Sequence, residues 1–222
     1  MFNIAIDGHA GSGKSTIAKE IAKKLKIKLL DTGAIYRGLA CAFLESKYKE
    51  LNLENVSKFA ANVIVKIDFE GDKQLVFVNG KDYTPFLRKE EISLMASKIS
   101  AYPQIRNKML DIQRDFAFGN DCVMEGRDIG TVVIPHAKVK IFITADVKIR
   151  AKRRYEQLQD KSNTTLEQVL KDLRDRDFND ENRETAPLKP AKDSIILDNS
   201  NLNIEQTVDK CIEIIKEETK SL

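Results

Sequence analysis

Tryptophan is absent from the 222-residue sequence, and cysteine is scarce. Cys41, Cys122 and Cys211 lie far apart, so they form neither a metal-binding spacing nor an even set of disulfide partners. No stretch approaches the ~18 apolar residues that a membrane helix needs. The first residues also lack the basic and apolar regions of a signal peptide. We therefore expect a protein with free thiols that works in the cytoplasm, away from membranes.

A strong excess of one charge is also missing, because 37 Lys and Arg residues stand against 34 Asp and Glu, a net charge of +3. That balance is too mild to predict nucleic-acid binding. A hydrophobic share of 42% is enough for a real core, and the length fits one α/β domain with inserts. The arginines are unevenly distributed: they are dense from Arg150 to Arg183 and sparse before Arg88.

Hydrophobic spacing predicts strands and helices in alternation, interrupted by one antiparallel insert. The expected strands are 2–6, 27–30, 63–69, 75–78, 122–124, 139–143 and 195–197. The expected helical stretches begin near Ser15, follow Asp31-Thr32-Gly33, run over 90–118, flank a loop near Lys161-Ser162-Asn163, and close the chain over 204–215. Turns are expected at Glu70-Gly71-Asp72 and Asn79-Gly80, a capping box at Thr165–Gln168, and a helix stop before Pro187 and Pro190. Five short, buried strands with helices between them predict a doubly wound parallel sheet.

The segment Gly8-His9-Ala10-Gly11-Ser12-Gly13-Lys14-Ser15 fits the phosphate-binding pattern G-x-x-x-x-G-K-[ST]. Glycines let backbone amides approach phosphate oxygens, and the positive end of the following helix favours the same anion. Lys14 can reach the β- and γ-phosphates, and the Ser15 hydroxyl can bind Mg²⁺. The alternative is a glycine turn that only packs a helix on a strand. The strand-loop-helix context favours nucleotide binding, with His9 as an exposed loop residue.

A regulatory GTPase is one candidate class. Asp68-Phe69-Glu70-Gly71 matches D-x-x-G, but it falls in the expected hairpin, and Asn107-Lys108-Met109-Leu110 lacks the final Asp of a guanine reader. A small-molecule kinase is the other class, and it needs arginines to neutralise a second phosphate.

Three segments offer such arginines. Arg37 follows the second strand, Arg127 follows the strand that ends near Glu125, and Arg176, Asp180 and Arg183 are spaced to share one helix face. Each arginine alone could equally form a surface salt bridge. Arg176, Asp180 and Arg183 could also be a row of alternating charges on a solvent-exposed helix face. Together with the phosphate loop they favour a kinase.

Three motifs resemble bacterial cytidylate kinases: L-L-D-T-G-A-I-Y-R at Leu29–Arg37, E-G-R-D-I-G-T-V-V-I-P at Glu125–Pro135, and R-x-x-x-D-x-x-R at Arg176–Arg183 followed by A-P-L. The resemblance covers nearly the whole chain. It implies a P-loop NTPase fold with a five-stranded parallel sheet, a monophosphate-binding insert with a small antiparallel sheet, and a short helical lid. The implied partition of the single domain is a core of about 1–30, 106–150 and 184–222, an insert of about 31–105 and a lid of about 151–183.

The resemblance also implies a transfer of the γ-phosphoryl of ATP to CMP or dCMP, with Mg²⁺, by a monomer. It assigns ATP to Gly8–Thr16 and Arg154, with Arg150 and Arg153 as further lid candidates. It assigns Mg²⁺ to Ser15 directly and to Glu125 through water. The implied CMP-binding residues are Thr32, Tyr36, Arg37, Ser97, Arg106, Arg127, Asp128, Arg176, Asp180 and Arg183. The implied catalytic residues are Lys14, Arg37, Arg127, Arg154 and Arg176.

The residues themselves are also compatible with other functions. A P-loop kinase could act on UMP, shikimate or dephospho-coenzyme A, although the hairpin insert argues against the last two. A nucleotide-binding module without catalysis is a third reading, in which MgATP binds but no monophosphate changes its turnover.

Overall fold

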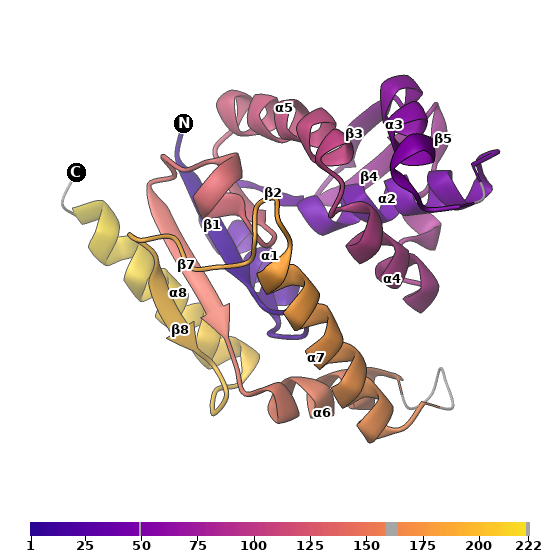
Figure 1. Ribbon diagram of the computed structural model, residues 1–222. Helices are drawn as coiled ribbons and strands as arrows, with labels where there is room; N and C mark the ends of the chain where they lie inside the picture. The colour runs from indigo at the N-terminus through magenta and orange to yellow at the C-terminus, as the bar shows by residue number, and fades with distance from the viewer. Residues whose placement is uncertain (49, 159–163, 221–222) are drawn as a thin grey trace. The chain divides into compact units, whose positions relative to one another are not determined.

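The computed structural model describes residues 1–48, 50–158 and 164–220 (Figure 1). The loop expected near Lys161 lies outside the described residues. The chain divides into two compact units, one made of Met1–Lys28 with Asn120–Leu222 and the other of Leu29–Gly119. The expected partition into core, insert and lid is a functional one and stays a prediction.

A five-stranded sheet has the order β2-β6-β1-β7-β8. Its strands are β1 (Asn3–Gly8), β2 (Lys28–Asp31), β6 (Cys122–Glu125), β7 (Val139–Thr144) and β8 (Ile195–Asp198). The pairs β1–β6, β1–β7 and β7–β8 are parallel. Strand β6 is buried along its whole length, as its apolar run Cys122–Met124 predicts. The expected parallel sheet is therefore confirmed.

Helices flank this sheet because each presents one apolar stripe to it. The first unit contains α1 (Lys14–Leu25), α6 (Val147–Leu158), α7 (Leu166–Asn182), α8 (Ile204–Lys220) and the π-helix η2 (Ile129–Val133). The hydrophobic pattern did not predict η2. The Thr165 side chain accepts from the Gln168 amide at 3.2 Å, so the N-cap half of the expected capping box is confirmed. A small cluster of Ala10, Ala151, Val169 and Leu173 packs α6 and α7 against the glycine loop.

The second unit joins α2 (Thr32–Glu45), α3 (Leu53–Asn62), α4 (Glu90–Ile99) and α5 (Pro103–Gly119) to the three-stranded sheet β3-β4-β5 and the short turn η1 (Thr84–Phe86). The sheet consists of β3 (Val65–Glu70), β4 (Lys73–Val78) and β5 (Lys81–Asp82). Gly38 allows α2 to approach β4, because a Cβ there would lie 2.5 Å from Val76 Cγ1. Phe43 and Phe59 meet edge to face, with centroids 5.2 Å apart.

The antiparallel insert was expected, and its turns are confirmed. Asn79 and Gly80, with φ of 51° and 81°, form the two-residue turn between β4 and β5. Asp68–Gly71 lies at the end of β3 in an antiparallel pair, so it has no parallel strand to serve as a GTPase switch. The stretch 90–118 is two helices, because the chain bends at 100–102 before Pro103. Helix α3 was missed.

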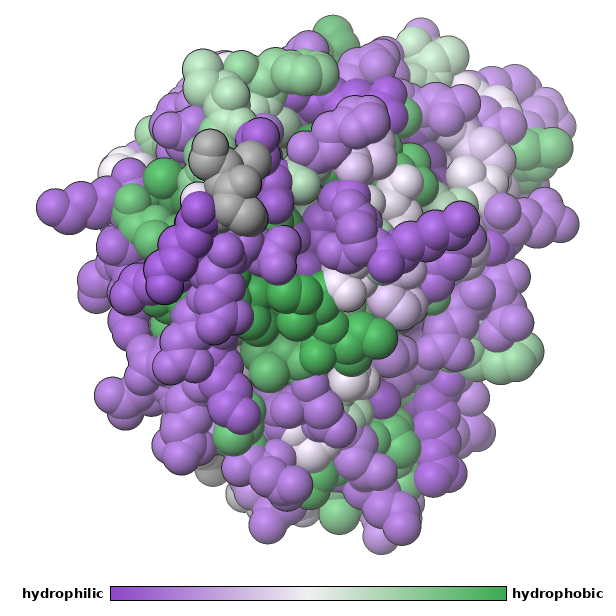
Figure 2. All heavy atoms as spheres, turned by 90° about the vertical axis from the view of Figure 1, so that its left-hand side faces the viewer, coloured by the Kyte–Doolittle hydropathy of each residue, from purple (hydrophilic) through white to green (hydrophobic). Residues whose placement is uncertain are grey.

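The surface seen in Figure 2 is mostly hydrophilic, with a hydrophobic patch near the centre of the view and other green areas around it. Large apolar side chains that are exposed include Ile196, on the edge strand β8, and Phe178 on α7. All three cysteines are buried and free, as expected. No helix in the described part of the chain combines the length and apolar character needed to cross a bilayer. The oligomeric state stays a prediction.

Candidate active site

The glycine loop leaves β1 and opens α1 at the carboxyl edge of the parallel sheet. Gly8 is required there, because its φ is 146° and a Cβ would lie 1.9 Å from the Ile143 carbonyl oxygen. Gly13 has φ of 87° and forms the N-cap of α1 without a side chain. The amides at this helix start are therefore open to an anion. The residues expected to bind ATP, Gly8–Thr16, form this loop and the first turn of α1.

Lys14 lies across the loop, where its Nζ donates to the His9 carbonyl at 2.7 Å. Burial lowers the pKa of Lys14 to about 7, Arg127 adds to this, and Glu125 opposes it. The charges of Arg176 and Asp180 act on the same ammonium. The structure thus brings five of the expected site residues into one electrostatic cluster.

Ser15 and Glu125 meet at the ends of neighbouring elements. The Ser15 hydroxyl donates to Glu125 Oε1, and Glu125 is the buried last residue of β6. A hydroxyl and a carboxylate oxygen are ligands that suit Mg²⁺, which is usually held by one or two protein oxygens plus phosphates. Among the described residues, no cluster of three or more His, Cys, Asp or Glu side chains could hold a metal alone. The donors present therefore fit a nucleotide-bound Mg²⁺.

Arg127 and Asp180 form a largely buried ion pair, with 2.9 Å between Nε and Oδ2. Burial acts to lower the pKa of the Arg127 guanidinium, but Asp180, with Glu125 and Asp177, outweighs it and the net shift is upward. Burial acts to raise the pKa of Asp180, but Arg127, Arg176 and Arg183 hold it below its usual value. The carboxylate is therefore ionised and shared among arginines, which contradicts a row of alternating charges on a solvent-exposed helix face.

The expectation that Arg183 shares a helix face with Arg176 and Asp180 is wrong. Helix α7 ends at Asn182, and Arg183 is its C-cap with an extended backbone. The chain turns back here because the Leu188 amide bonds the Asp180 carbonyl, and Pro187 cannot continue a helix. Arg183 nevertheless reaches Asp128, with 3.5 Å between Nη2 and Oδ1.

His9 is not the exposed loop residue that was expected. Its side chain is only 18% exposed, and Nε2 lies 2.8 Å from Glu181 Oε1 on α7. Its Nδ1 lies 3.3 Å from Thr144 Oγ1, and its ring meets Phe142 edge-on. The variable position of the motif is thus occupied by a residue that joins the loop to α7.

Two of the candidate lid arginines have other partners. Arg150 is buried and donates to the carbonyls of Ala145 and Ala10 and to Asp177. Arg153 donates to Asn199 and to the Leu202 carbonyl. Arg154 lies on α6, one turn after Arg150, and its contact with ATP stays a prediction.

The unit Leu29–Gly119 holds the other expected residues. Thr32 begins α2, and the Asp31 side chain caps that helix by accepting from the Ala34 amide at 2.8 Å. Asp31 also pairs with Arg37, with 2.7 Å between Oδ2 and Nη2.

Tyr36 and Arg106 are also brought together within this unit, since the guanidinium carbon lies 5.7 Å from the ring centroid. Ser97 lies on α4. The roles of these residues in binding CMP stay predictions.

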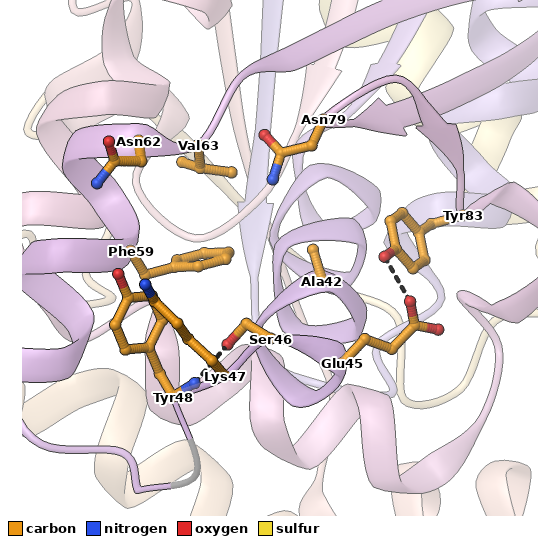
Figure 3. A pocket seen from close by; sticks show the side chains of 10 residues that line it. All are labelled: Ala42, Glu45, Ser46, Lys47, Tyr48, Phe59, Asn62, Val63, Asn79 and Tyr83. Carbon is orange, nitrogen blue, oxygen red and sulfur yellow. Dashed lines mark hydrogen bonds between the residues drawn. The ribbon is translucent and has the colours of Figure 1, made fainter.

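A cavity of about 340 Å³ in the same unit lies apart from these residues, near Phe59, Glu45 and Tyr83 (Figure 3). Tyr83 donates to Glu45 at 2.7 Å along its wall. Its lining includes no residue expected to bind a nucleotide.

Four residues that shape the site were not assigned any role from the sequence: Asp7, Asp31, Asp177 and Asn199. Asp7 carried a signal, because it is a lone acidic residue in an apolar strand, directly before the glycine loop. Its buried carboxylate accepts from the Ile129 and Gly130 amides at 2.8 Å each, so it holds the segment that follows Arg127 and Asp128. Asp177 carried no such signal in the sequence, because it lies in a helix of mixed charges.

Asp7→Asn should change how stability depends on pH. Burial raises the pKa of Asp7 to about 6 in the folded chain, from an ordinary 3.8. The carboxyl therefore contributes stability below pH 4 that is lost as the pH rises through 6. Relative to wild type, the free energy of unfolding of Asp7→Asn should rise by on the order of 2 kcal/mol between pH 4 and pH 7.5. Urea unfolding at both pH values checks this, and a difference that does not change with pH would contradict it.

The site defines a P-loop nucleotide-binding protein. It consists of a strand, a glycine loop with open amides, a helix, and a lysine beside a hydroxyl–carboxylate pair. The family model described as Cytidylate kinase matches residues 4–217. The chain belongs to the cytidylate kinase family.

Individual relatives agree with that assignment. A cytidylate kinase of Caldicellulosiruptor saccharolyticus is 42% identical over 213 residues, 96% of this chain and 94% of the relative. A cytidylate kinase of Fervidobacterium nodosum is 43% identical over 215 residues, 96% of each. The crystal structure of an uncharacterized protein from Eubacterium ventriosum matches with a TM-score of 0.53 at 14% identity, covering 97% of this chain and 99% of that one. That structure supports the fold alone.

Proposed function

We propose that this chain transfers the γ-phosphoryl of ATP to CMP or dCMP, giving ADP and CDP or dCDP. The family match over residues 4–217 supports the reaction. The observation that carries it is the geometry beside the phosphate loop, where Ser15 donates to Glu125 and the Arg127 guanidinium is held by Asp180, with 2.9 Å between Nε and Oδ2. A hydrolase would need a positioned water, whereas a kinase needs paired cationic groups for two phosphates.

ATP would bind with its polyphosphate over the loop Gly8–Thr16 and the start of α1. Ser15 would hold Mg²⁺ directly and Glu125 would hold it through water, as their adjacent oxygens allow. Held there by Ser15 and Glu125, the metal would supply positive charge that offsets the charge of the polyphosphate. Lys14 would then turn from the His9 carbonyl toward the phosphates, and Arg154 would approach them from α6.

CMP would be held by the phosphate-binding residues Thr32, Arg37, Arg127 and Arg176, by the ribose-binding pair Asp180 and Arg183, by Tyr36, and by the base readers Ser97, Arg106 and Asp128. Asp128 is buried, and its carboxylate can accept from the exocyclic amino group of cytosine. Uracil offers a carbonyl there, an acceptor facing an acceptor. An unmet buried polar group costs ~1–3 kcal/mol, so CMP should be favoured over UMP by about tenfold or more.

The transfer needs no catalytic base, because the CMP phosphate oxygen is already an anionic nucleophile at neutral pH. This oxygen forms a bond to the γ-phosphorus in line as the bond to the ADP oxygen breaks. Lys14, Arg127 and Arg176 stabilise the charge on the transferred group, and a closing lid would exclude water.

An assay of ADP release with MgATP and a panel of acceptors tests the proposal. CMP and dCMP should give fast turnover, and UMP should be at least about tenfold poorer in kcat/KM. AMP and shikimate should be inactive. Equal turnover with UMP or AMP would keep phosphoryl transfer but refute base reading by Asp128. No stimulation by any acceptor would favour a nucleotide-binding module instead.

A further inference from the structure

Three carbonyl oxygens of the phosphate loop are held by side chains. The His9 carbonyl accepts from Lys14 Nζ at 2.7 Å, the Ala10 carbonyl from Arg150 Nη1 at 3.0 Å, and the Ser12 carbonyl from Asn199 Nδ2 at 2.9 Å. In a planar trans peptide the N–H points opposite to the C=O. Holding the Ala10 and Ser12 carbonyls on one side therefore turns the amides of Gly11 and Gly13 to the other side. Convergent amides of this kind form an anion-binding concavity.

Arg150 is fixed in place by three acceptors and is 5% exposed. Its Nε donates to the Ala145 carbonyl at 2.8 Å, at the end of β7. Its Nη1 is shared between the Ala10 carbonyl and Asp177 Oδ2, which lies 2.5 Å away on α7. Asp177 is itself buried, at 8% exposure. Buried ion pairs of this geometry resist rearrangement, because moving one partner strands the other charge.

Asn199 holds the other carbonyl and is 3% exposed. The orientation of its amide group is set by Arg153, whose Nη1 donates to Asn199 Oδ1 at 3.1 Å. The side-chain nitrogen of Asn199 is therefore the atom that faces the Ser12 carbonyl. Since Asn199 directly follows β8 and Arg150 lies on α6, the loop is held from two separate elements.

We propose that Arg150 and Asn199 are positioning residues that orient the phosphate-loop amides toward the polyphosphate of ATP. This inference rests on the proposed binding of ATP at the loop. It gives Arg150 a role other than approaching ATP as part of a lid. Lys14, which donates to the third carbonyl, would turn from the His9 carbonyl to the phosphates. Arg150 and Asn199 would then maintain the loop conformation while the nucleotide is bound.

Arg150→Lys and Asn199→Asp test this with little change in volume. Lysine cannot meet three acceptors with a planar fork, and the aspartate replaces the Nδ2 donor by an oxygen that faces the Ser12 carbonyl. Binding of MgADP carrying a fluorescent methylanthraniloyl group should weaken about tenfold in each variant, while the KM for CMP changes less than twofold. Asp177→Asn, which keeps an acceptor for Arg150, should fall between wild type and Arg150→Lys. Arg174→Lys, an exposed arginine of α7, is the matched control.

Nucleotide affinity within twofold of wild type in both variants would overturn the proposal. So would a parallel loss of ADP and CMP affinity together with a lower Tm, because that pattern indicates general loosening. If Arg150→Lys fails to fold, the affinity of Asn199→Asp for the labelled MgADP decides whether the proposal holds. The binding readout needs no phosphoryl transfer, so weakened ADP binding in a protein that does not phosphorylate CMP would keep this inference and refute the proposed function.

Discussion

Arg127→Ala is expected to lower kcat for CMP phosphorylation about a thousandfold, the range seen when a cationic group on a transferred phosphoryl is removed. Arg127 follows β6, and its guanidinium is fixed by Asp180 at 2.9 Å. Without it, two anionic substrates would approach each other with one fewer compensating charge. Steady-state kinetics with saturating MgATP and CMP measure the effect.

The fold should survive this change, because Arg176 and Arg183 still act on Asp180. The Tm should fall by only a few degrees. Arg127→Lys is the matched variant: it keeps the charge but loses the fork, and it should recover part of the lost rate. Unchanged turnover in Arg127→Ala would remove this residue from the mechanism.

Lys14→Met should lower kcat by at least about a thousandfold, because it removes the ammonium expected on the β- and γ-phosphates. Methionine fills much of the same space, and the lost hydrogen bond to the His9 carbonyl is the main structural change. Relief from burying a charge should leave the free energy of unfolding near that of wild type.

Activity and urea unfolding of Lys14→Met, measured side by side, separate the two effects. Lys19→Met, at an exposed position of the same helix, serves as control and should be as active as wild type. Loss of activity in step with loss of folded protein would contradict a direct role for Lys14.

The sequence predicted those parts of the molecule where one local rule governs the structure. Buried strands such as β6 are short apolar runs, Asn79-Gly80 demands a particular turn, and the glycine loop has a fixed pattern between a strand and a helix. These features placed the parallel sheet, the hairpin insert and the phosphate loop correctly.

Contacts between segments far apart in the chain could not be predicted from local sequence rules. Arg150 and Asp177 are 27 residues apart, and each looks like an ordinary helix-surface charge until the fold buries both. The same holds for His9 and Glu181. The end of α7 was misjudged because charge spacing alone continues through Arg183, and that spacing does not show that the Leu188 amide bonds back to the Asp180 carbonyl.

Transfer of label from ATP is the most direct test of the central claim. The protein is incubated with [γ-³²P]ATP, Mg²⁺ and CMP, and the products are separated by thin-layer chromatography alongside gel analysis of the protein. Direct in-line transfer to CMP predicts label in CDP, none on the protein, and little inorganic phosphate when CMP is left out. Label that leaves as inorganic phosphate at the same rate with or without CMP, or that stays on the protein, would contradict it.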